Sequence, residues 1–469
     1  MSVEPKKRVL VIGAGFSGFL VARDLHKDFD VLVVDAKEYF EYTPGILRAY
    51  VKPAHFDALT FTVQEVIERK LHSKFLWGEV MTLNGVEKTA TVKPIFSKEK
   101  ETINFDYCVI CAGCNFNPMH KWGQSLWFAT IHEAARPEGD WPHIDERFIE
   151  GRRRHILEEN AFIAGLNAKS ANILVVGAGF IGVEWVTELQ YFFPNLRLTI
   201  IDFLNKCLGP LPDTAASYCD GYMRRKGIVC MYGVKYNPKD PEFWPSIGME
   251  GEPDHTYVCI GVKASNYFME EHGAECLSDK GPGGGKWIHV NKKLQVVTKD
   301  RKVWAGGSIF AVGDCNQTFA DEIKPIPKIS YPGEEQATHV CKSIKFLEGK
   351  TGCCGMFMKP REAINSWWPW GAGMFATSLG PHDACFVMAA QSEPRTGLLT
   401  LWGWASAIQK EIIESSKVDE CKGGRMGQLI WHWVHHTPCH CWGEGCSRNC
   451  CTSCTWPDWC CDWECCRCC

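Results

Sequence analysis

An internal repeat of 18 residues constrains the fold more than any other feature of the sequence. RVLVIGAGFSGFLVARDL (8–25) aligns without a gap on NILVVGAGFIGVEWVTEL (172–189), at an offset of 164 residues. Each copy begins with a short apolar run, passes through a GxGxxG turn and enters a helical stretch. A second apolar run follows each copy and ends in an acid, at Asp35 and Asp202. The chain therefore predicts two βαβ units whose strands are buried on both faces.

Both glycine turns have the spacing of a dinucleotide-binding site. The first glycine permits the tight bend, the second lets the backbone approach a pyrophosphate, and the third lets the helix pack on the strand. The helix start offers N–H groups to the phosphates, and the acid accepts hydrogen bonds from a ribose. The six glycines are Gly13, Gly15, Gly18, Gly177, Gly179 and Gly182. One such turn can serve packing alone, but two complete copies favour two bound dinucleotides.

The length of 469 residues exceeds what one hydrophobic core supports, so two or three domains are expected. Further apolar runs at Tyr107–Cys111, Tyr257–Ile260 and Ile309–Val312 suit additional strands. After about Lys350 the composition shifts toward tryptophan, which indicates a separate C-terminal region. The predicted fold class is α/β, with two Rossmann-like dinucleotide-binding domains and a smaller C-terminal region.

Charge and hydropathy exclude several classes of function. Lys+Arg 51 against Asp+Glu 55 leaves no basic excess, which argues against nucleic acid as a partner. No apolar run of about 18 residues is present, so a membrane-spanning helix is not expected. The first strand starts within ten residues of Met1, and Ser2 replaces the glycine that myristoylation needs. We therefore expect a cytoplasmic protein.

Three further segments follow in a characteristic order: NFDYCVICAGCN (104–115), SIFAVGDCN (308–316) and SYPGEEQATHV (330–340). Together with the glycine turns, they resemble the two-dinucleotide-domain flavoproteins. In that family FAD is bound first and NAD(P)H second, and the chain then returns to the FAD domain. The resemblance covers roughly residues 7–350.

This resemblance implies roles for individual residues. An Ala-Thr-Gly-type turn corresponds to 111–113, Asp314 would bind the flavin's ribityl and pyrophosphate region, and the helix beginning near Ser330 would face the isoalloxazine ring. A helix N-terminus suits that position because reduced flavin carries negative charge near N1 and O2. The two glutamates that follow Gly333 are explained equally well as ordinary acidic residues in the first turn of a helix. The cofactor-binding residues implied in addition to the six glycines and two acids are Ala112, Gly113, Gly313, Asp314, Glu335 and Gln336.

The absence of a CxxxxC pair narrows the resemblance. Ala36–Thr82 contains no cysteine, so a disulfide reductase mechanism is not expected. AKEYFEYTPGILRAY (36–50) and WGWASAIQKEIIESSKV (402–418) instead resemble segments of type II NADH:quinone oxidoreductases and apoptosis-inducing-factor-like flavoproteins. In those families the segment equivalent to Tyr42, Thr43 and Pro44 approaches the flavin, and Glu184 would lie near the nicotinamide or flavin. Glu184 can equally be a helix acid that complements the dipole.

The implied activity is transfer of hydride from NADH to FAD, followed by electron transfer to a quinone-like acceptor. The cofactor carries the chemistry, so no catalytic acid–base pair is required. A carboxylate at Asp202 repels a 2′-phosphate, which favours NADH over NADPH, although NADPH remains open.

The motif order also predicts domain boundaries. Residues 1–165 form the first part of the FAD domain, 166–300 the NAD(P)H domain and 301–350 the FAD return segment. Residues 351–420 form a C-terminal region, and 421–469 a tail rich in cysteine and tryptophan.

The cysteines leave two alternatives open. Cys111 and Cys114, with Cys341, Cys353 or Cys354, could serve a sulfide:quinone-type reaction, although small-residue use at a strand end explains the first two better. Twelve of the 26 cysteines crowd into the last 31 residues. There Cys439, His440 and Cys441 could bind a soft metal, or the tail could be lipidated, in a redox-sensing flavoprotein. The irregular spacing favours a disordered, oxidation-prone extension. Its tryptophans would suit peripheral membrane contact.

Overall fold

The computed structural model describes residues 5–116, 146–350, 364, 366–367, 373–389 and 394–436. Its largest element is a seven-stranded sheet in the order β16-β8-β1-β2-β5-β6-β7. The first five strands of that order run parallel, and the last two add an antiparallel edge. The strands are β1 (Arg8–Ile12), β2 (Asp30–Asp35), β5 (Lys74–Asn84), β6 (Thr89–Pro94), β7 (Glu101–Asn104), β8 (Tyr107–Ile110) and β16 (Ile309–Ala311).

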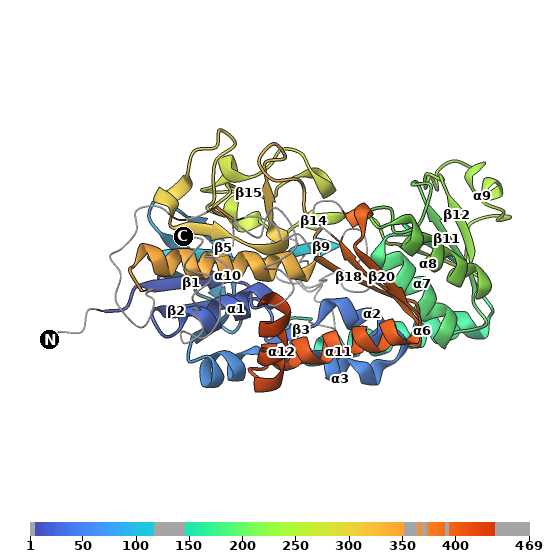
Figure 1. Ribbon diagram of the computed structural model, residues 1–469, viewed down its shortest axis with the longest axis horizontal. Helices are drawn as coiled ribbons and strands as arrows, with labels where there is room; N and C mark the ends of the chain where they lie inside the picture. The colour runs from blue at the N-terminus through green and yellow to red at the C-terminus, as the bar shows by residue number, and fades with distance from the viewer. Residues whose placement is uncertain are drawn as a thin grey trace.

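Strand β1 lies at the centre of this sheet, and Val9, Leu10 and Val11 on it are fully buried. Burial of successive residues is typical of a parallel strand covered on both faces. Helices α1 (Phe16–Leu25) and α10 (Ser330–Leu347) pack against each other beside it (Figure 1). The chain thus returns to the first sheet after residue 308 through β16 and α10.

A second, four-stranded sheet repeats the arrangement on a smaller scale. Its order is β12-β11-β10-β13, and all its pairings are parallel. The strands are β10 (Asn172–Val176), β11 (Arg197–Asp202), β12 (Val229–Tyr232) and β13 (His255–Val258), with helices α7 (Phe180–Phe192) and α8 (Asp213–Arg225). This unit lies at one end of the molecule, in green (Figure 1).

The C-terminal region contacts both units. Strands β18 (Gly373–Ser378), β19 (Ala384–Ala389) and β20 (Leu399–Trp402) form an antiparallel sheet, which contacts α7 and α8. Helix α11 (Trp404–Cys421) runs along the lower edge of the view against α3 (Phe56–Leu59), and α12 (Arg425–His436) packs on α11 (Figure 1). Gly423 lies between the two helices at φ +75°, a conformation that ends α11 without strain.

The predicted α/β class with two Rossmann-like units is confirmed, and the three further strands fall within two residues of their predicted starts. The domain boundaries remain predictions. The one placed after residue 165 falls inside helix α6 (Ile149–Ala168). The segment 402–418, noted above for its resemblance to those families, forms most of α11, which begins at Trp404 and ends at Cys421. Across the described ranges, no helix combines the length and apolarity needed to cross a bilayer.

Candidate active site

The three glycines of the first turn have different surroundings: two are closely packed and one faces open space. Gly13 adopts φ +104°, and a Cβ there would lie 2.5 Å from the Cys111 carbonyl oxygen. A Cβ on Gly18 would lie 2.0 Å from the Gly13 carbonyl oxygen. Nothing lies within 4 Å of a Cβ built on Gly15. Only the middle glycine therefore faces free space, where a pyrophosphate could approach the backbone.

The second turn has the same geometry. Gly177 adopts φ +101°, a Cβ on Gly182 would lie 1.8 Å from the Gly177 carbonyl oxygen, and Gly179 faces open space. In this turn the Ala178 N–H donates to Asp202 Oδ2 at 2.6 Å.

Each acid thus holds its own glycine turn. The Ala14 N–H donates to Asp35 Oδ2 at 2.7 Å, matching the bond to Asp202. Oδ1 of each acid accepts one further backbone N–H, from Lys37 and Leu204 respectively. Because a carboxylate offers about four acceptor positions, both retain capacity for ribose hydroxyls.

One cavity of about 810 Å³ joins the two turns, a volume within the usual range for cofactor sites. It also extends to the end of β8, the turn after β16 and the C-terminal region. The predicted residues that line it are Gly13, Gly15, Asp35, Pro44, Ala112, Gly113, Gly179, Glu184, Gly313 and Asp314. The predicted residues outside its lining are Gly18, Gly177, Gly182, Asp202, Glu335 and Gln336.

The side chains at the start of helix α10 are not arranged as expected, since Glu335 and Gln336 do not reach the cavity. Tyr331 and Gly333 line the cavity, whereas Glu335 and Gln336 lie further along the helix and are buried behind it. Gln336 Oε1 accepts hydrogen bonds from the Gly313 N–H and from Asn316 Nδ2, both at 2.8 Å. Gln336 therefore fixes the Gly313 turn and does not lie beside the cavity.

Asp314 lies in a buried polar group that includes a lysine. Burial raises the pKa of Asp314 to about 6, although the Lys328 ammonium acts in the opposite direction. Burial lowers the pKa of Lys328, against the attraction of Asp314. Lys328 lines the cavity, and its Nζ donates to the Asn316 carbonyl. No motif pointed to Lys328, because it lies on an irregular segment before α10.

The cysteines near the cavity are protonated thiols. Burial raises the pKa of both Cys111 and Cys114 well above the ordinary value, and the Cys114 Sγ lies 3.8 Å from Asp314 Oδ2. Cys341 is buried on α10 and does not line the cavity. Cys353, Cys354, Cys439, His440 and Cys441 lie outside the described residues. Within the described part of the chain, no cluster of potential metal ligands occurs.

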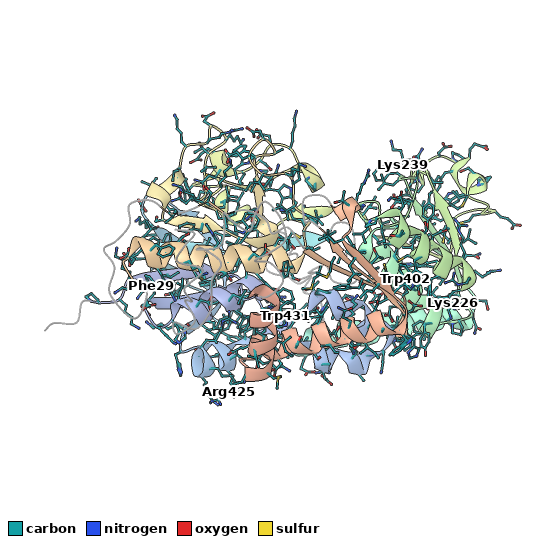
Figure 2. All side chains as sticks on the ribbon, viewed as in Figure 1. Phe29, Lys226, Lys239, Trp402, Arg425 and Trp431 are labelled. Carbon is teal, nitrogen blue, oxygen red and sulfur yellow. The ribbon has the colours of Figure 1, made fainter. Side chains whose placement is uncertain are left out.

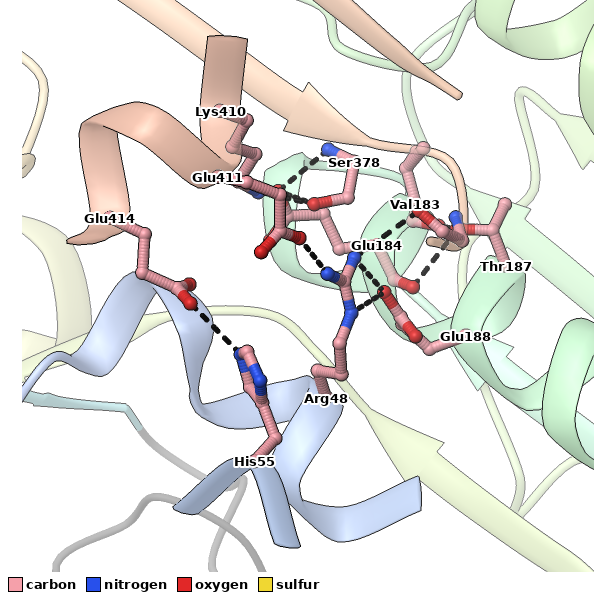
Figure 3. Close-up of polar contacts among 11 residues, drawn as sticks. Arg48, His55, Val183, Glu184, Thr187, Glu188, Ser378, Lys410, Glu411 and Glu414 are labelled. Atoms are coloured by element: carbon pink, nitrogen blue, oxygen red, sulfur yellow. Dashed lines mark hydrogen bonds and ion pairs between the residues drawn. The ribbon is translucent and has the colours of Figure 1, made fainter. Parts of the chain in front are cut away.

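A network of ion pairs lies beside the cavity (Figure 3). It connects the unit of the first glycine turn, the unit of the second glycine turn and the C-terminal region. Glu184 binds the Lys410 ammonium and accepts the Ser378 N–H at 2.9 Å. Arg48 pairs with Glu188 at 2.9 Å and also with Glu411. We call these residues and the His55–Glu414 pair, which is 2.9 Å long, the junction cluster. Glu184 is the residue of the junction cluster that lies in a motif identified from the sequence. The partners of Glu184 lie far from it in the sequence, so residue spacing could not predict these contacts.

A second buried network lies at another part of the cavity wall. Arg152 lines the cavity and is 2% exposed. It pairs with Glu41 at 2.7 Å and Glu146 at 2.8 Å, and donates to the Tyr50 hydroxyl at 2.9 Å. Arg152 belongs to a run of arginines with acidic neighbours, a pattern typical of a solvated helix face, whereas the structure buries this arginine against two carboxylates.

Known proteins share this architecture. The chain matches the pyridine nucleotide-disulphide oxidoreductase family over residues 7–337. A type II NADH:quinone oxidoreductase of Staphylococcus haemolyticus is 22% identical over 443 residues, 90% of this chain and 97% of that protein. Apoptosis-inducing factor homolog B of Dictyostelium discoideum is 22% identical over 351 residues, 70% and 78% of the two chains. The sulfide:quinone oxidoreductase structure from Aquifex aeolicus has a TM-score of 0.66 at 16% identity, covering 91% of this chain and 94% of that chain. The resemblance seen in the motifs is thereby confirmed, and the chain belongs to the pyridine nucleotide-disulphide oxidoreductase family.

Proposed function

We propose that the protein oxidises NADH and passes the electrons, through a bound FAD, to a quinone-like acceptor. The observation that carries this proposal is that one cavity is lined by residues of both glycine turns and of the C-terminal region. Two nucleotides held at one cavity can exchange hydride directly. Relatives named as type II NADH:quinone oxidoreductases support the same assignment.

FAD fits the first turn on grounds of shape and chemistry. Gly15 and Gly113 are open to the cavity, so a phosphate chain can approach the backbone there. Asp35 supplies acceptors for a ribose, and Asp314 supplies one for the ribityl region. When bound, the flavin would supply a two-electron carrier between NADH and the acceptor.

NADH fits the second turn better than NADPH. Asp202 would repel a 2′-phosphate, and the nearby Lys206 is already engaged. Its Nζ donates to the Leu211 carbonyl at 3.0 Å and to Asp213 at 2.5 Å. No other cation follows Asp202 before residue 213. A 2′-phosphate would therefore lack a free positive partner on this loop.

The protein's own residues position the reactants and provide polar groups at the cavity. Oxidation of NADH by a quinone consumes one proton and yields NAD⁺ and a quinol. Glu184 joins the cavity to the junction cluster, and Lys410 and Ser378 hold its carboxylate there. Pro44 and Glu184 thus border the reacting centre, while the cofactor carries the chemistry.

Peripheral membrane contact would suit a lipophilic acceptor. Trp404, Ile408 and Ile412 lie at four-residue spacing along α11 and are 50–71% exposed. Leu399 and Leu401 on the edge strand β20 are also exposed. Such an apolar row, with an aromatic residue at one end, suits the interface of a bilayer. We expect Ile408→Glu with Ile412→Glu to reduce co-flotation with liposomes. Val86→Glu changes an exposed residue on a turn distant in the sequence from α11, and it should not reduce co-flotation.

The experiment that tests the activity is a survey of acceptors with purified holoenzyme. NADH consumption should be fast with a quinone that has no isoprenoid tail, such as menadione, and slow with oxygen. Equally slow turnover with quinones, ferricyanide and oxygen would contradict the proposal and indicate a redox-sensing flavoprotein. Turnover of sulfide with quinone in the absence of NADH would indicate the sulfide:quinone alternative.

A further inference from the structure

We propose that Tyr42 and Trp431 form an acceptor subsite of the cavity, which binds a planar apolar molecule bearing a carbonyl oxygen. This inference rests on the proposed function and adds the residues that recognise the acceptor. The two side chains come from opposite ends of the described chain and line the same cavity.

Tyr42 offers an unused hydrogen-bond donor. Its side chain is 5% exposed, and its ring packs edge-on against Phe16, with 5.6 Å between centroids. Within the described ranges, its hydroxyl has no hydrogen-bond partner of its own. Because Tyr42 lines the cavity, its hydroxyl can donate to an oxygen of a ligand bound there.

The carboxylates around Tyr42 do not supply that acceptor. Burial, with the charges of Glu414, Glu334 and Glu184, raises the pKa of Tyr42 well above its ordinary value. The hydroxyl therefore stays protonated and can donate to a ligand oxygen. Each of the three carboxylates already has a basic partner: His55 for Glu414 at 2.9 Å, Lys417 for Glu334 at 2.6 Å, and Lys410 for Glu184.

Trp431 forms an aromatic wall of the same cavity. It is 5% exposed and packs with Tyr331, Met374 and Ile413, which all line the cavity. The Lys417 ammonium lies 4.5 Å from the centre of its ring and is outside the cavity lining. Figure 2 shows Trp431 within the body of the molecule, whereas Arg425 on the same helix points outward. The indole is therefore held from behind by a buried cation.

The chemistry of the wall selects the acceptor. Met374, Phe375, Ala376 and Ile413 make this part of the lining predominantly apolar. A flat ring gains contact area against an indole, and a carbonyl oxygen on it can accept from the Tyr42 hydroxyl. A quinone has both features. Ferricyanide, a compact anion, has neither and would gain nothing from this subsite.

Binding without turnover tests the inference. Oxidised holoenzyme is titrated with menadione in the absence of NADH, and the Kd is measured by calorimetry. Tyr42→Phe removes one hydrogen bond and should weaken binding about three- to tenfold. Trp431→Ala should weaken it about tenfold, and Trp431→Phe less. Tyr107→Phe and Trp244→Phe, which change buried or half-buried rings outside the cavity lining, should leave the Kd unchanged.

A second measurement separates this inference from the proposed function. Bleaching of the flavin by NADH should change less than about twofold in the Trp431 variants, as should ferricyanide reduction. If the wild-type protein binds no flavin or is not bleached, the proposed function fails. If it is bleached but Tyr42→Phe and Trp431→Phe bind menadione as tightly as wild type, the subsite is wrong. If Tyr42→Phe slows bleaching or shifts the flavin absorbance, the hydroxyl serves the flavin, which also overturns the inference.

Discussion

The two glycine turns are nearly identical in themselves and differ in what surrounds them. In both, the third glycine packs against the carbonyl of the first, so that a Cβ on it would lie only 2.0 or 1.8 Å from that oxygen, and an acid accepts the N–H that follows the first glycine. The first turn belongs to a sheet that the chain re-enters through β16 and α10, which bring Gly313 to the cavity. The second belongs to a four-stranded sheet that receives no later strand in the described ranges.

This difference explains how one motif can serve two nucleotides. The return segment encloses the first turn, and Asp35 lines the cavity. At the second turn Asp202 lies outside the lining, and the cavity is reached by Gly179, Phe180, Ile181 and Glu184 and by the residues that follow β13. An enclosed site suits a permanently bound cofactor, and a site that meets the cavity at one end suits a substrate that enters and leaves. The predictions below test whether this distinction holds.

The largest effect is expected from the third glycines. Gly18→Ala and Gly182→Ala each place a Cβ about 2 Å from a backbone oxygen, which cannot move away. We expect each to lower the unfolding free energy of its own unit by about 3 kcal/mol or more. Calorimetry should show two separately affected transitions. Gly165→Ala, on α6 with open space around it, is the control and should not destabilise. Tolerance of either alanine would show that the two turns are not equivalent in packing.

The middle glycines should separate the two nucleotides. Gly15→Val and Gly179→Val have ordinary negative φ angles and open space, so both variants should fold. Gly15→Val should be purified without the yellow chromophore. Gly179→Val should keep the flavin but require at least about tenfold more NADH for bleaching, because the side chain occupies the phosphate position. Loss of flavin in both variants, or in neither, would break the assignment.

Exchange of the acids should change different properties. Asp202→Ser removes the charge that repels a 2′-phosphate, so the ratio of kcat/KM for NADPH to that for NADH should rise about tenfold or more. Asp35→Ser is the matched variant in the first copy, and it should reduce flavin retention with an unchanged coenzyme ratio. A shifted ratio in Asp35→Ser would reverse the order of the two nucleotides.

A further effect concerns the return segment and its dependence on pH. The pKa of Asp314 is raised from 3.8 to about 6. Ionisation in the folded apoprotein therefore costs stability as the pH rises from about 4 to about 6, and the cost persists above that range. Asp314→Asn should stabilise the apoprotein by about 2 kcal/mol at about pH 7.5, less than the full shift because the side chain faces the cavity.

Denaturant unfolding across this pH range measures the effect of Asp314→Asn. The gain should disappear below about pH 4, where wild-type Asp314 is protonated in both states. Asn should also weaken FAD binding. A gain that is independent of pH would mean that ionisation of Asp314 is not its cause.

Local motifs predicted the fold and one side of the site. Glycine spacing, apolar strands and terminal acids are properties of adjacent residues, so the two Rossmann-like units could be inferred directly. Lys328, Arg152, Lys410 and Trp431 were missed because each reaches the cavity through tertiary packing without a recognisable spacing. Glu335 and Gln336 were expected beside the cavity, but both lie outside its lining. The first turn of α10 occupies that position, and Gln336 instead satisfies the Gly313 N–H.

Anaerobic rapid mixing of wild-type holoenzyme with NADH, followed by menadione, tests the two-nucleotide assignment most directly. The account predicts that the yellow absorbance of the flavin is lost on mixing with NADH and restored by menadione. Gly179→Val should keep most of its yellow absorbance at a limiting NADH concentration that bleaches the wild-type protein. Bleaching of Gly179→Val at the wild-type rate, or wild-type protein that binds no flavin, would contradict the assignment of FAD to the first turn and NADH to the second.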